Sequence, residues 1–163
     1  MAMTNRAVNI LRPLATTPCQ AYMDNRLQLY EVIDALLRQT GPAKLTISTF
    51  STSDGFLRRI FRLKSEGLIT SCVLFLDLKA TRKTVLLRGF IESVADEVLL
   101  CENHSKVVLL QNDSHRVTIV TSQNQTTGNR MECGIITTDT NIFNDINNGF
   151  DKLRTQSVTI GAI

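Results

Sequence analysis

The sequence predicts an α/β protein whose mixed β-sheet is flanked by helices on both faces. Helical and strand-like apolar patterns alternate in the first part of the chain, and strand patterns follow one another directly in the second. Size is the third observation. A chain of 163 residues, 43% hydrophobic and 20% charged, suits a single domain over 1–163, with an N-terminal arm or short strand over 1–23.

Helices and strands alternate through the first half of the chain. The expected elements are a helix over 24–39, a strand over 43–50, a helix from 51 or 53 to about 66, a strand over 70–78, a polar and basic turn over 79–83 and a helix over about 84–94. Asp24 is a candidate cap for the first helix, which the Gly41-Pro42 pair stops. Ser51 or Ser53 caps the second helix.

Strand patterns dominate the second half. Runs of β-branched and apolar residues predict one long strand over 97–110, a strand over 116–124 and a short strand over 132–138. A helical pattern around 141–154 follows them. Consecutive strands after alternating elements favour a mixed sheet over a purely parallel one.

The composition bounds the class of function. A net charge of +3 and a pI of about 8.8 are compatible with an anionic partner, but they fall short of a histone-like protein. The opening residues lack the apolar core of a signal peptide. No run approaches the roughly 20 apolar residues needed to span a membrane. We therefore expect a cytoplasmic protein that does not enter the membrane.

The cysteines argue against a metal centre. Four cysteines occur without any CxxC pair. Cys72, Cys101 and Cys133 lie in apolar stretches, where a reduced, buried thiol is expected. A metal site drawn from two of these cysteines and the two histidines lacks a second close ligand pair, so we expect no metal and no cofactor.

Polar residues recur two apart near the ends of two expected strands. His104 and Lys106 begin one apolar run, and Ser122 and Asn124 end the next. Because side chains alternate across a strand, each pair shares a face. An imidazole, an ammonium, a hydroxyl and an amide together suit phosphate chemistry. The alternative, a solvated strand end, stays open on spacing alone.

These residues resemble a known signature. The sequences His104-Ser-Lys106, Thr-Ser122-Gln-Asn124 and the following Gly-Asn-Arg-Met-Glu132 are similar to the phospholipase D-like phosphodiesterase superfamily. That signature is written HxK, four residues, Asp and then GSxN, with a glutamate several residues later. The segment ISTFSTSDGFLRRI (47–60) also resembles the family's first strand and helix. The order of elements from about 24 to 154 resembles one half of the family's fold.

The chain departs from the signature in three places. Gln111 stands where the family has aspartate, with Asp113 only nearby, and Thr121 replaces the glycine of GSxN. The turn between the two strands is also about three residues longer. In the family this aspartate usually has a structural role, so its replacement need not abolish the chemistry.

The resemblance implies a two-histidine mechanism that needs no metal. One histidine attacks the phosphodiester and forms a phosphohistidine, and a second protonates the leaving oxygen and then activates water. The chain has one HxK motif, because His115 lies in a predicted turn without a lysine two residues on. The resemblance therefore implies a homodimer with His104 of both chains in one site.

The resemblance also implies roles for the other motif residues. Lys106 and Asn124 would clamp the phosphate, Ser122 would assist them, and Glu132 would orient an imidazole. We therefore expect the catalytic set to be completed by these four side chains around His104.

The expected substrate is a nucleic acid, DNA rather than lipid. Lys79, Arg82 and Lys83 follow an expected central strand, at the edge where α/β sheets bind ligands, and are candidates for a nucleic-acid channel, with an ordinary polar loop as the alternative. The basic run over 58–64 is instead expected to be a solvated helix face, with Phe61 among the residues that turn to the core.

Two other functions stay open at this point. The chain could be a catalytically weak or inactive phospholipase D-like module that binds nucleic-acid backbone. It could also pair with a different HxK-bearing chain or join a larger complex.

Overall fold

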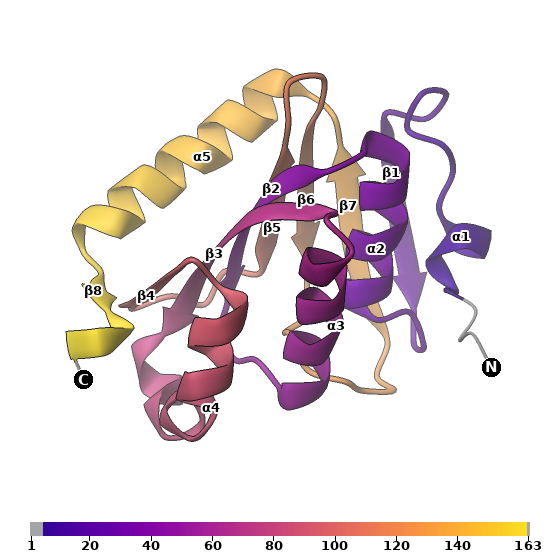
Figure 1. The fold of residues 1–163 in the computed structure, drawn as a ribbon. Coiled ribbons are helices and arrows are strands. Elements are labelled where there is room, and N and C mark those ends of the chain that lie inside the picture. Colours follow the sequence, from indigo (N-terminus) through magenta and orange to yellow (C-terminus); the bar gives the residue numbers. More distant parts are fainter. Residues whose placement is uncertain (1–4, 163) are drawn as a thin grey trace.

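An eight-stranded mixed sheet forms the centre of the protein. The computed structural model describes residues 5–162, apart from the side chains of residues 81–83 and 162. The strand order is β1-β7-β6-β5-β2-β3-β4-β8 (Figure 1). The strands are β1 (Cys19–Asp24), β2 (Ala43–Thr49), β3 (Ile69–Asp77), β4 (Glu97–Cys101), β5 (Val107–Gln111), β6 (Arg116–Thr121), β7 (Glu132–Thr137) and β8 (Val158–Thr159).

Helices cover both faces of this sheet. They are α1 (Ala7–Ile10), α2 (Leu29–Thr40), α3 (Asp54–Ser65), α4 (Thr81–Val94) and α5 (Thr140–Thr155), with short 3₁₀ turns at Leu78–Ala80 and Ile160–Ala162. The larger core lies between the sheet and α2, α3 and α4, and a second, smaller core lies under α5 on the opposite face. The predicted fold class, a mixed sheet flanked by helices on both faces, is confirmed.

The connections explain why the sheet is mixed. β2, β3 and β4 are parallel because helices α3 and α4 join them. The chain then returns to the middle of the sheet, where β5 pairs antiparallel with β2, and β6, β7 and β1 follow as antiparallel neighbours. The expected arm over 1–23 therefore ends in β1, an edge strand paired with β7.

The first long helix starts later than the sequence pattern predicts. Asp24 ends β1, and its carboxylate accepts hydrogen bonds from the backbone N–H groups of Arg26 at 2.6 Å and Leu27 at 2.7 Å. Helix α2 starts at Leu29, because Gln28 and Glu31 form a reciprocal capping box. The prediction of Asp24 as the helix cap is wrong. Ser53 does cap α3, through its side chain and the N–H of Phe56.

The expected long strand over 97–110 is also wrong. The chain forms β4 over Glu97–Cys101 and β5 over Val107–Gln111, and these strands lie on opposite sides of the β2-β3 pair. Just after β4 ends, the buried carboxylate of Asp77 accepts the backbone N–H of Asn103 at 2.7 Å, so this N–H bonds to a side chain and not to a neighbouring strand. Residues 102–106 are consequently a connection across the edge of the sheet.

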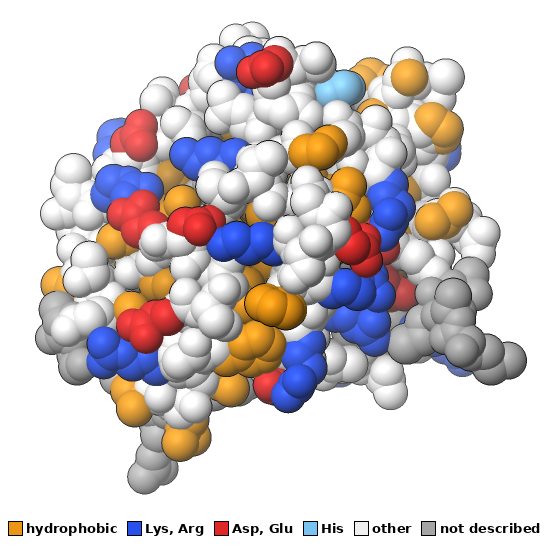
Figure 2. Space-filling view, in the orientation of Figure 1, with side chains coloured by type: hydrophobic (Ala, Val, Ile, Leu, Met, Phe, Trp, Pro, Cys, Tyr) orange, Lys and Arg blue, Asp and Glu red, His pale blue; other side chains and the backbone are white. Residues whose placement is uncertain are grey.

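The basic helix over 58–64 lies on a mixed, solvated face. Figure 2 shows basic and acidic side chains interspersed over the face that α2, α3 and α4 cover. Arg58 pairs with Asp54 at 2.7 Å, and Lys64 pairs with Asp96 at 2.8 Å. Phe61 is 48% exposed, contrary to the expectation, because it lies about 100° around the helix from fully buried Ile60.

Among residues 5–162, no helix combines the length and the apolar character that a membrane-spanning segment needs. The four cysteines are free. Cys72 and Cys101 are buried as expected, whereas Cys133 is exposed, because it projects from the part of the sheet that α5 leaves uncovered. Burial raises the pKa of the Cys72 thiol to about 12.

Candidate active site

Four strand ends meet at one edge of the sheet. β2 ends at Thr49 and β6 ends at Thr121, while β5 begins at Val107 and β7 begins at Glu132. Because β5 is antiparallel to both β2 and β6, and β7 is antiparallel to β6, these four ends lie side by side. All of the sequence-predicted catalytic residues lie at this edge, just outside or at the end of a strand.

A buried hydrogen-bond network holds the segment that carries His104. The Asn103 side-chain amide donates to Ser48 Oγ at 2.7 Å, and its carbonyl oxygen accepts the Ser105 backbone N–H at 2.9 Å. The hydroxyls of Ser48 and Ser105 are also hydrogen-bonded to each other. Asp77 fixes the same segment from β3. His104 is thus presented from a rigid connection, although its own side chain is exposed.

The imidazole of His104 lies between a cation and an aromatic ring. Lys106 Nζ is 3.4 Å from His104 Nδ1, and it also donates to the His104 carbonyl oxygen at 3.1 Å. The Phe50 ring packs against the imidazole with a centroid separation of 5.3 Å and an interplanar angle of 58°. This arrangement puts positive charge beside an accessible imidazole, which suits an anionic substrate.

The second half of the site follows β6. The Ser122 hydroxyl donates to the Glu132 carboxylate and accepts the Cys133 backbone N–H at 3.0 Å. Asn124 accepts a hydrogen bond from the Thr49 hydroxyl at 3.4 Å. The two halves are joined through the backbone, since the N–H of Thr121 donates to the Lys106 carbonyl oxygen at 3.1 Å.

The motif residues therefore gather into two groups. His104 and Lys106 touch each other, and Ser122 touches Glu132, but no hydrogen bond among the described residues joins His104 to Glu132. The strand prediction for 116–124 is too long, because β6 ends at Thr121 and leaves Ser122 and Asn124 in the connection. Side chains in a connection need not alternate between the two faces of the sheet, as they do in a strand.

Gln111 does not lie at this edge of the sheet. It is the last residue of β5 and pairs in register with Arg116, at the opposite end of the strand from Lys106. His115 lies in the same turn, also far along the sheet from His104. The position of the family's aspartate is thus separated from the reactive groups by the length of β5.

Several residues that support the site were not predicted from the sequence. Tyr22 of β1 donates to Gln123 Oε1 at 2.8 Å and is 3.1 Å from the Thr121 hydroxyl, so it braces both sides of Ser122. Desolvation of this buried side chain raises the pKa of Tyr22 to about 12. Gln123 in turn donates to the Leu27 carbonyl oxygen at 2.6 Å. No sequence spacing links Tyr22 to residues a hundred positions later; only the β1-β7 pairing brings them together.

The brace formed by Tyr22 depends on Gly134. A Cβ at Gly134 would lie 2.6 Å from Cζ and Oη of Tyr22, whose hydroxyl is already fixed. We expect Gly134→Ala to lower the free energy of unfolding by about 1–3 kcal/mol, as overpacking of a buried site does. Chemical denaturation measures the change. Gly149→Ala, an exposed helical position with nothing within 4 Å of the added carbon, is the matched control and should lose nothing.

A small polar cavity adjoins the site. Its volume is about 70 Å³, and Asn124 and Glu132 line it together with Gln28 and Arg130. Arg130 is exposed and lies in the loop between β6 and β7. The loop is fastened to α2, because the Gln28 side-chain amide donates to the Gly128 carbonyl oxygen at 2.9 Å. The cavity places a second cation beside the predicted phosphate ligands.

The predicted nucleic-acid contacts are only partly described. Lys79 is exposed in the turn after β3, at the same edge of the sheet as the end of β2. The side chains of Arg82 and Lys83 lie outside the described residues. The basic turn predicted over 79–83 is shorter, because α4 begins at Thr81. Within the described residues, no group of three His, Cys, Asp or Glu side chains could hold a metal ion.

Comparison with solved structures identifies the fold. NucT from Helicobacter pylori superposes with a TM-score of 0.65 and 15% identity, over 87% of this chain and 99% of NucT. Nuc from Salmonella typhimurium, a phospholipase D family member, superposes with a TM-score of 0.65 and 13% identity, over 86% and 97% of the two chains. The chain has a phospholipase D-like fold.

The phospholipase D-like fold also occurs in longer chains. Phosphatidylserine synthase from Haemophilus influenzae Rd KW20 matches with a TM-score of 0.62 and 16% identity, over 87% of this chain but 40% of the synthase. The chain thus spans nearly the full length of NucT and Nuc and less than half of the synthase. No family model and no curated protein matches the sequence itself. The resemblance seen in the motifs therefore extends to the fold.

Proposed function

We propose that this chain is a metal-independent phosphodiesterase, a nuclease acting on DNA, with one active site shared across a homodimer. The observation that carries the proposal is the convergence of His104, Lys106, Ser122, Asn124 and Glu132 at one edge of a phospholipase D-like sheet. A solvated strand end would need neither the buried network behind His104 nor the brace behind Ser122.

The proposed reaction has two displacements at phosphorus. In the first, the imidazole of His104 attacks, a phosphorus–nitrogen bond forms, and the phosphorus–oxygen bond to the leaving group breaks while a second imidazole supplies the proton to that oxygen. In the second displacement, the second imidazole takes a proton from water, and the resulting hydroxide displaces the His104 nitrogen from phosphorus. Lys106 and Asn124 balance the charge on the non-bridging oxygens.

The second imidazole must come from another chain. His115, the only other histidine, lies in the turn at the opposite end of β5 and β6. A two-fold axis beside His104 would bring the same residue of a second copy to the site. Glu132 has one carboxylate oxygen occupied by Ser122, and its other oxygen is available to orient the partner's imidazole.

An exposed apolar surface next to the site supports this dimer. Helix α5 covers β3, β4 and β5 on its face of the sheet but leaves the ends of β6, β7 and β1 open. We call this area the open sheet face; it consists of Ala21, Met23, Val120, Cys133 and Ile135. Met23 is 74%, Ile135 53% and Val120 44% exposed.

The position of the open sheet face favours a second copy of this chain as its partner. The groove that Met23 and Ile135 line also includes Ser122, so the apolar surface runs directly into the site. A second copy seated there would bury the apolar side chains and approach the reactive edge at the same time. A partner of another kind would cover the apolar residues without completing the chemistry.

DNA is the proposed substrate because the groups around the site favour a polyanion. Lys106, Arg130 and Lys79 lie on or near the same edge, and the chain carries a net charge of +3. Phosphate contacts of this kind are sequence-independent and weaken with salt. The fold alone does not choose the substrate, since a phosphatidylserine synthase shares it.

A second candidate is a module that binds the DNA backbone without cutting it. The replacement of the family's aspartate by Gln111 favours this alternative. The position of Gln111 at the far end of β5 weighs against it, because the substitution does not touch His104 or Lys106.

Cleavage in the presence of a chelator separates the two candidates. The purified protein is incubated with bis(p-nitrophenyl) phosphate and with plasmid DNA in EDTA. We expect nitrophenolate release and nicked plasmid, together with an acid-labile phosphoenzyme in rapidly quenched samples. Retarded plasmid without any cleavage would support the binding module, and neither binding nor cleavage would refute both.

A further inference from the structure

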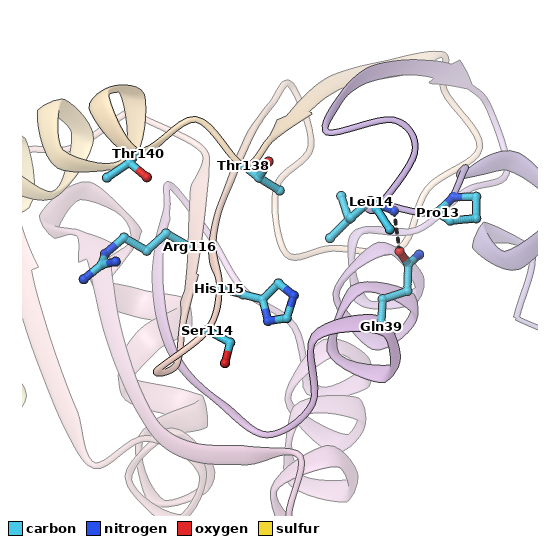
Figure 3. A pocket seen from close by; sticks show the side chains of 9 residues that line it. Pro13, Leu14, Gln39, Ser114, His115, Arg116, Thr138 and Thr140 are labelled. Atoms are coloured by element: carbon cyan, nitrogen blue, oxygen red, sulfur yellow. Dashed lines mark hydrogen bonds between the residues drawn. The ribbon is translucent and has the colours of Figure 1, made fainter.

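A cavity at the opposite end of the sheet is unrelated to the proposed active site. It has a volume of about 530 Å³ and lies beside the turn between β5 and β6. Its walls come from the N-terminal segment, the end of α2, the β5-β6 turn and the start of α5 (Figure 3). The lining residues are Pro13, Leu14, Ala15, Gln39, Ser114, His115, Arg116, Thr138 and Thr140.

One wall of this cavity is held by Asn112. Its side-chain amide donates to the carbonyl oxygens of Thr40 at 2.9 Å and Pro42 at 3.2 Å. Its carbonyl oxygen accepts the backbone N–H groups of Ser114 at 3.0 Å and His115 at 2.8 Å. The turn that carries His115 is thus hydrogen-bonded to the end of α2 through Asn112.

The facing wall is held by two glutamines. Gln39 Oε1 accepts the Leu14 backbone N–H at 2.8 Å, and Gln20 Oε1 accepts the Arg12 backbone N–H at 2.8 Å. The Gln20 amide also donates to the Arg12 carbonyl oxygen at 2.9 Å. These hydrogen bonds hold the N-terminal segment against the end of α2 and the start of β1. The cavity is therefore formed before any ligand binds.

The polar groups of the cavity are rich in hydrogen-bond donors. The side-chain oxygen of Gln39 already accepts the Leu14 backbone N–H. The side-chain N–H₂ group of Gln39 is therefore the part that can donate to a ligand. Arg116 is exposed and has no carboxylate partner among the described residues. Hydroxyls of Ser114, Thr138 and Thr140 complete the set, and no carboxylate lines the cavity. Such a lining suits an anion.

The side chain of His115 lines the cavity. Figure 3 shows the imidazole pointing from the turn toward Leu14 and Gln39. Its Nδ1 is buried and has no hydrogen-bond partner among the described residues. Buried ring nitrogens normally find a partner, so an unpaired one is unusual beside an open cavity. The opposite side of the cavity, formed by Pro13, Leu14 and Ala15, is mainly apolar.

We propose that this cavity binds a small organic phosphate, of the size of a nucleoside monophosphate. Arg116 and Thr140, which lie on the α5 side of the cavity (Figure 3), would hold the phosphate, and the imidazole of His115 and the apolar residues would contact the organic part. The volume falls in the range of small-ligand pockets, about 300–1,000 Å³. The proposal does not depend on phosphodiesterase activity, because the cavity shares no residue with the proposed active site.

The two histidines of the chain provide a direct test. NMR spectra of the imidazole carbon-bound protons contain signals from His104 and His115 alone. The His104→Ala protein assigns the signals and also weakens competing binding at the active site. We expect titration with adenosine monophosphate to shift the His115 signals in both proteins. Inorganic phosphate, which lacks the organic part, should shift them less at equal concentration.

Substitution of Arg116 completes the test. Arg116→Ala should weaken binding of adenosine monophosphate by about tenfold or more, since a charge-assisted hydrogen bond is lost. Lys152→Ala, an exposed cation on α5, is the matched control and should bind as the wild type does. Unmoved His115 signals, or a shift confined to His104, would overturn the proposal, as would equal affinity of the Arg116→Ala protein.

Discussion

Mixing equal amounts of wild-type and His104→Ala chains should leave about a quarter of the wild-type activity at the same total chain concentration. The reason is the shared site: if chains pair at random, about one dimer in four carries two copies of His104, and only that dimer can both attack and protonate. Independent active sites would instead leave about half. The chains are unfolded together and refolded before turnover of bis(p-nitrophenyl) phosphate is measured.

Two further samples make this result interpretable. The His104→Ala protein alone should lose activity by about 10³-fold or more, because both displacements require the imidazole. His115→Ala, which removes the other histidine far from the site, should mix with the wild type without loss of activity. Half activity in the His104→Ala mixture would contradict the shared site, and normal turnover of His104→Ala alone would remove histidine from the chemistry.

Local patterns of the sequence are sufficient to predict much of the fold. Apolar periodicity locates α3 and α5, and the β-branched run over 43–50 locates β2, because these elements bury one face each. The motif residues at 104–106 and 122–124 lie at the same edge of the sheet. Their backbone connection through Lys106 and Thr121 joins two segments that are close in sequence.

The rest depends on contacts that no local pattern contains. The run over 97–110 reads as one strand because both of its halves are apolar. In the structure the halves form β4 and β5 on different sides of β2 and β3, and the Asn103 N–H between them bonds to the Asp77 carboxylate. Tyr22 and Asp77 are ordinary strand residues until the sheet order places them beside the site. Cys133 looks buried because its neighbours in sequence are apolar, whereas the open sheet face leaves it exposed.

Ile135→Asp should convert the protein into a monomer and remove most of its activity. Ile135 is 53% exposed in the middle of the open sheet face, where the proposed partner would bury it. An unpaired carboxylate at the centre of an interface costs about 2 kcal/mol or more, and a two-fold interface contains it twice. Association should therefore weaken by about 10³-fold, which sedimentation velocity or size-exclusion chromatography with light scattering can measure.

Leu86→Asp is the matched control for this substitution. Leu86 is 82% exposed on α4, away from the open sheet face, so the same change there should leave association and turnover intact. Circular dichroism should show native structure for both variants, because neither side chain is part of a core. If Ile135→Asp stays dimeric and active, the two-fold axis lies elsewhere. If the wild type is an active monomer, the second imidazole cannot come from a second copy.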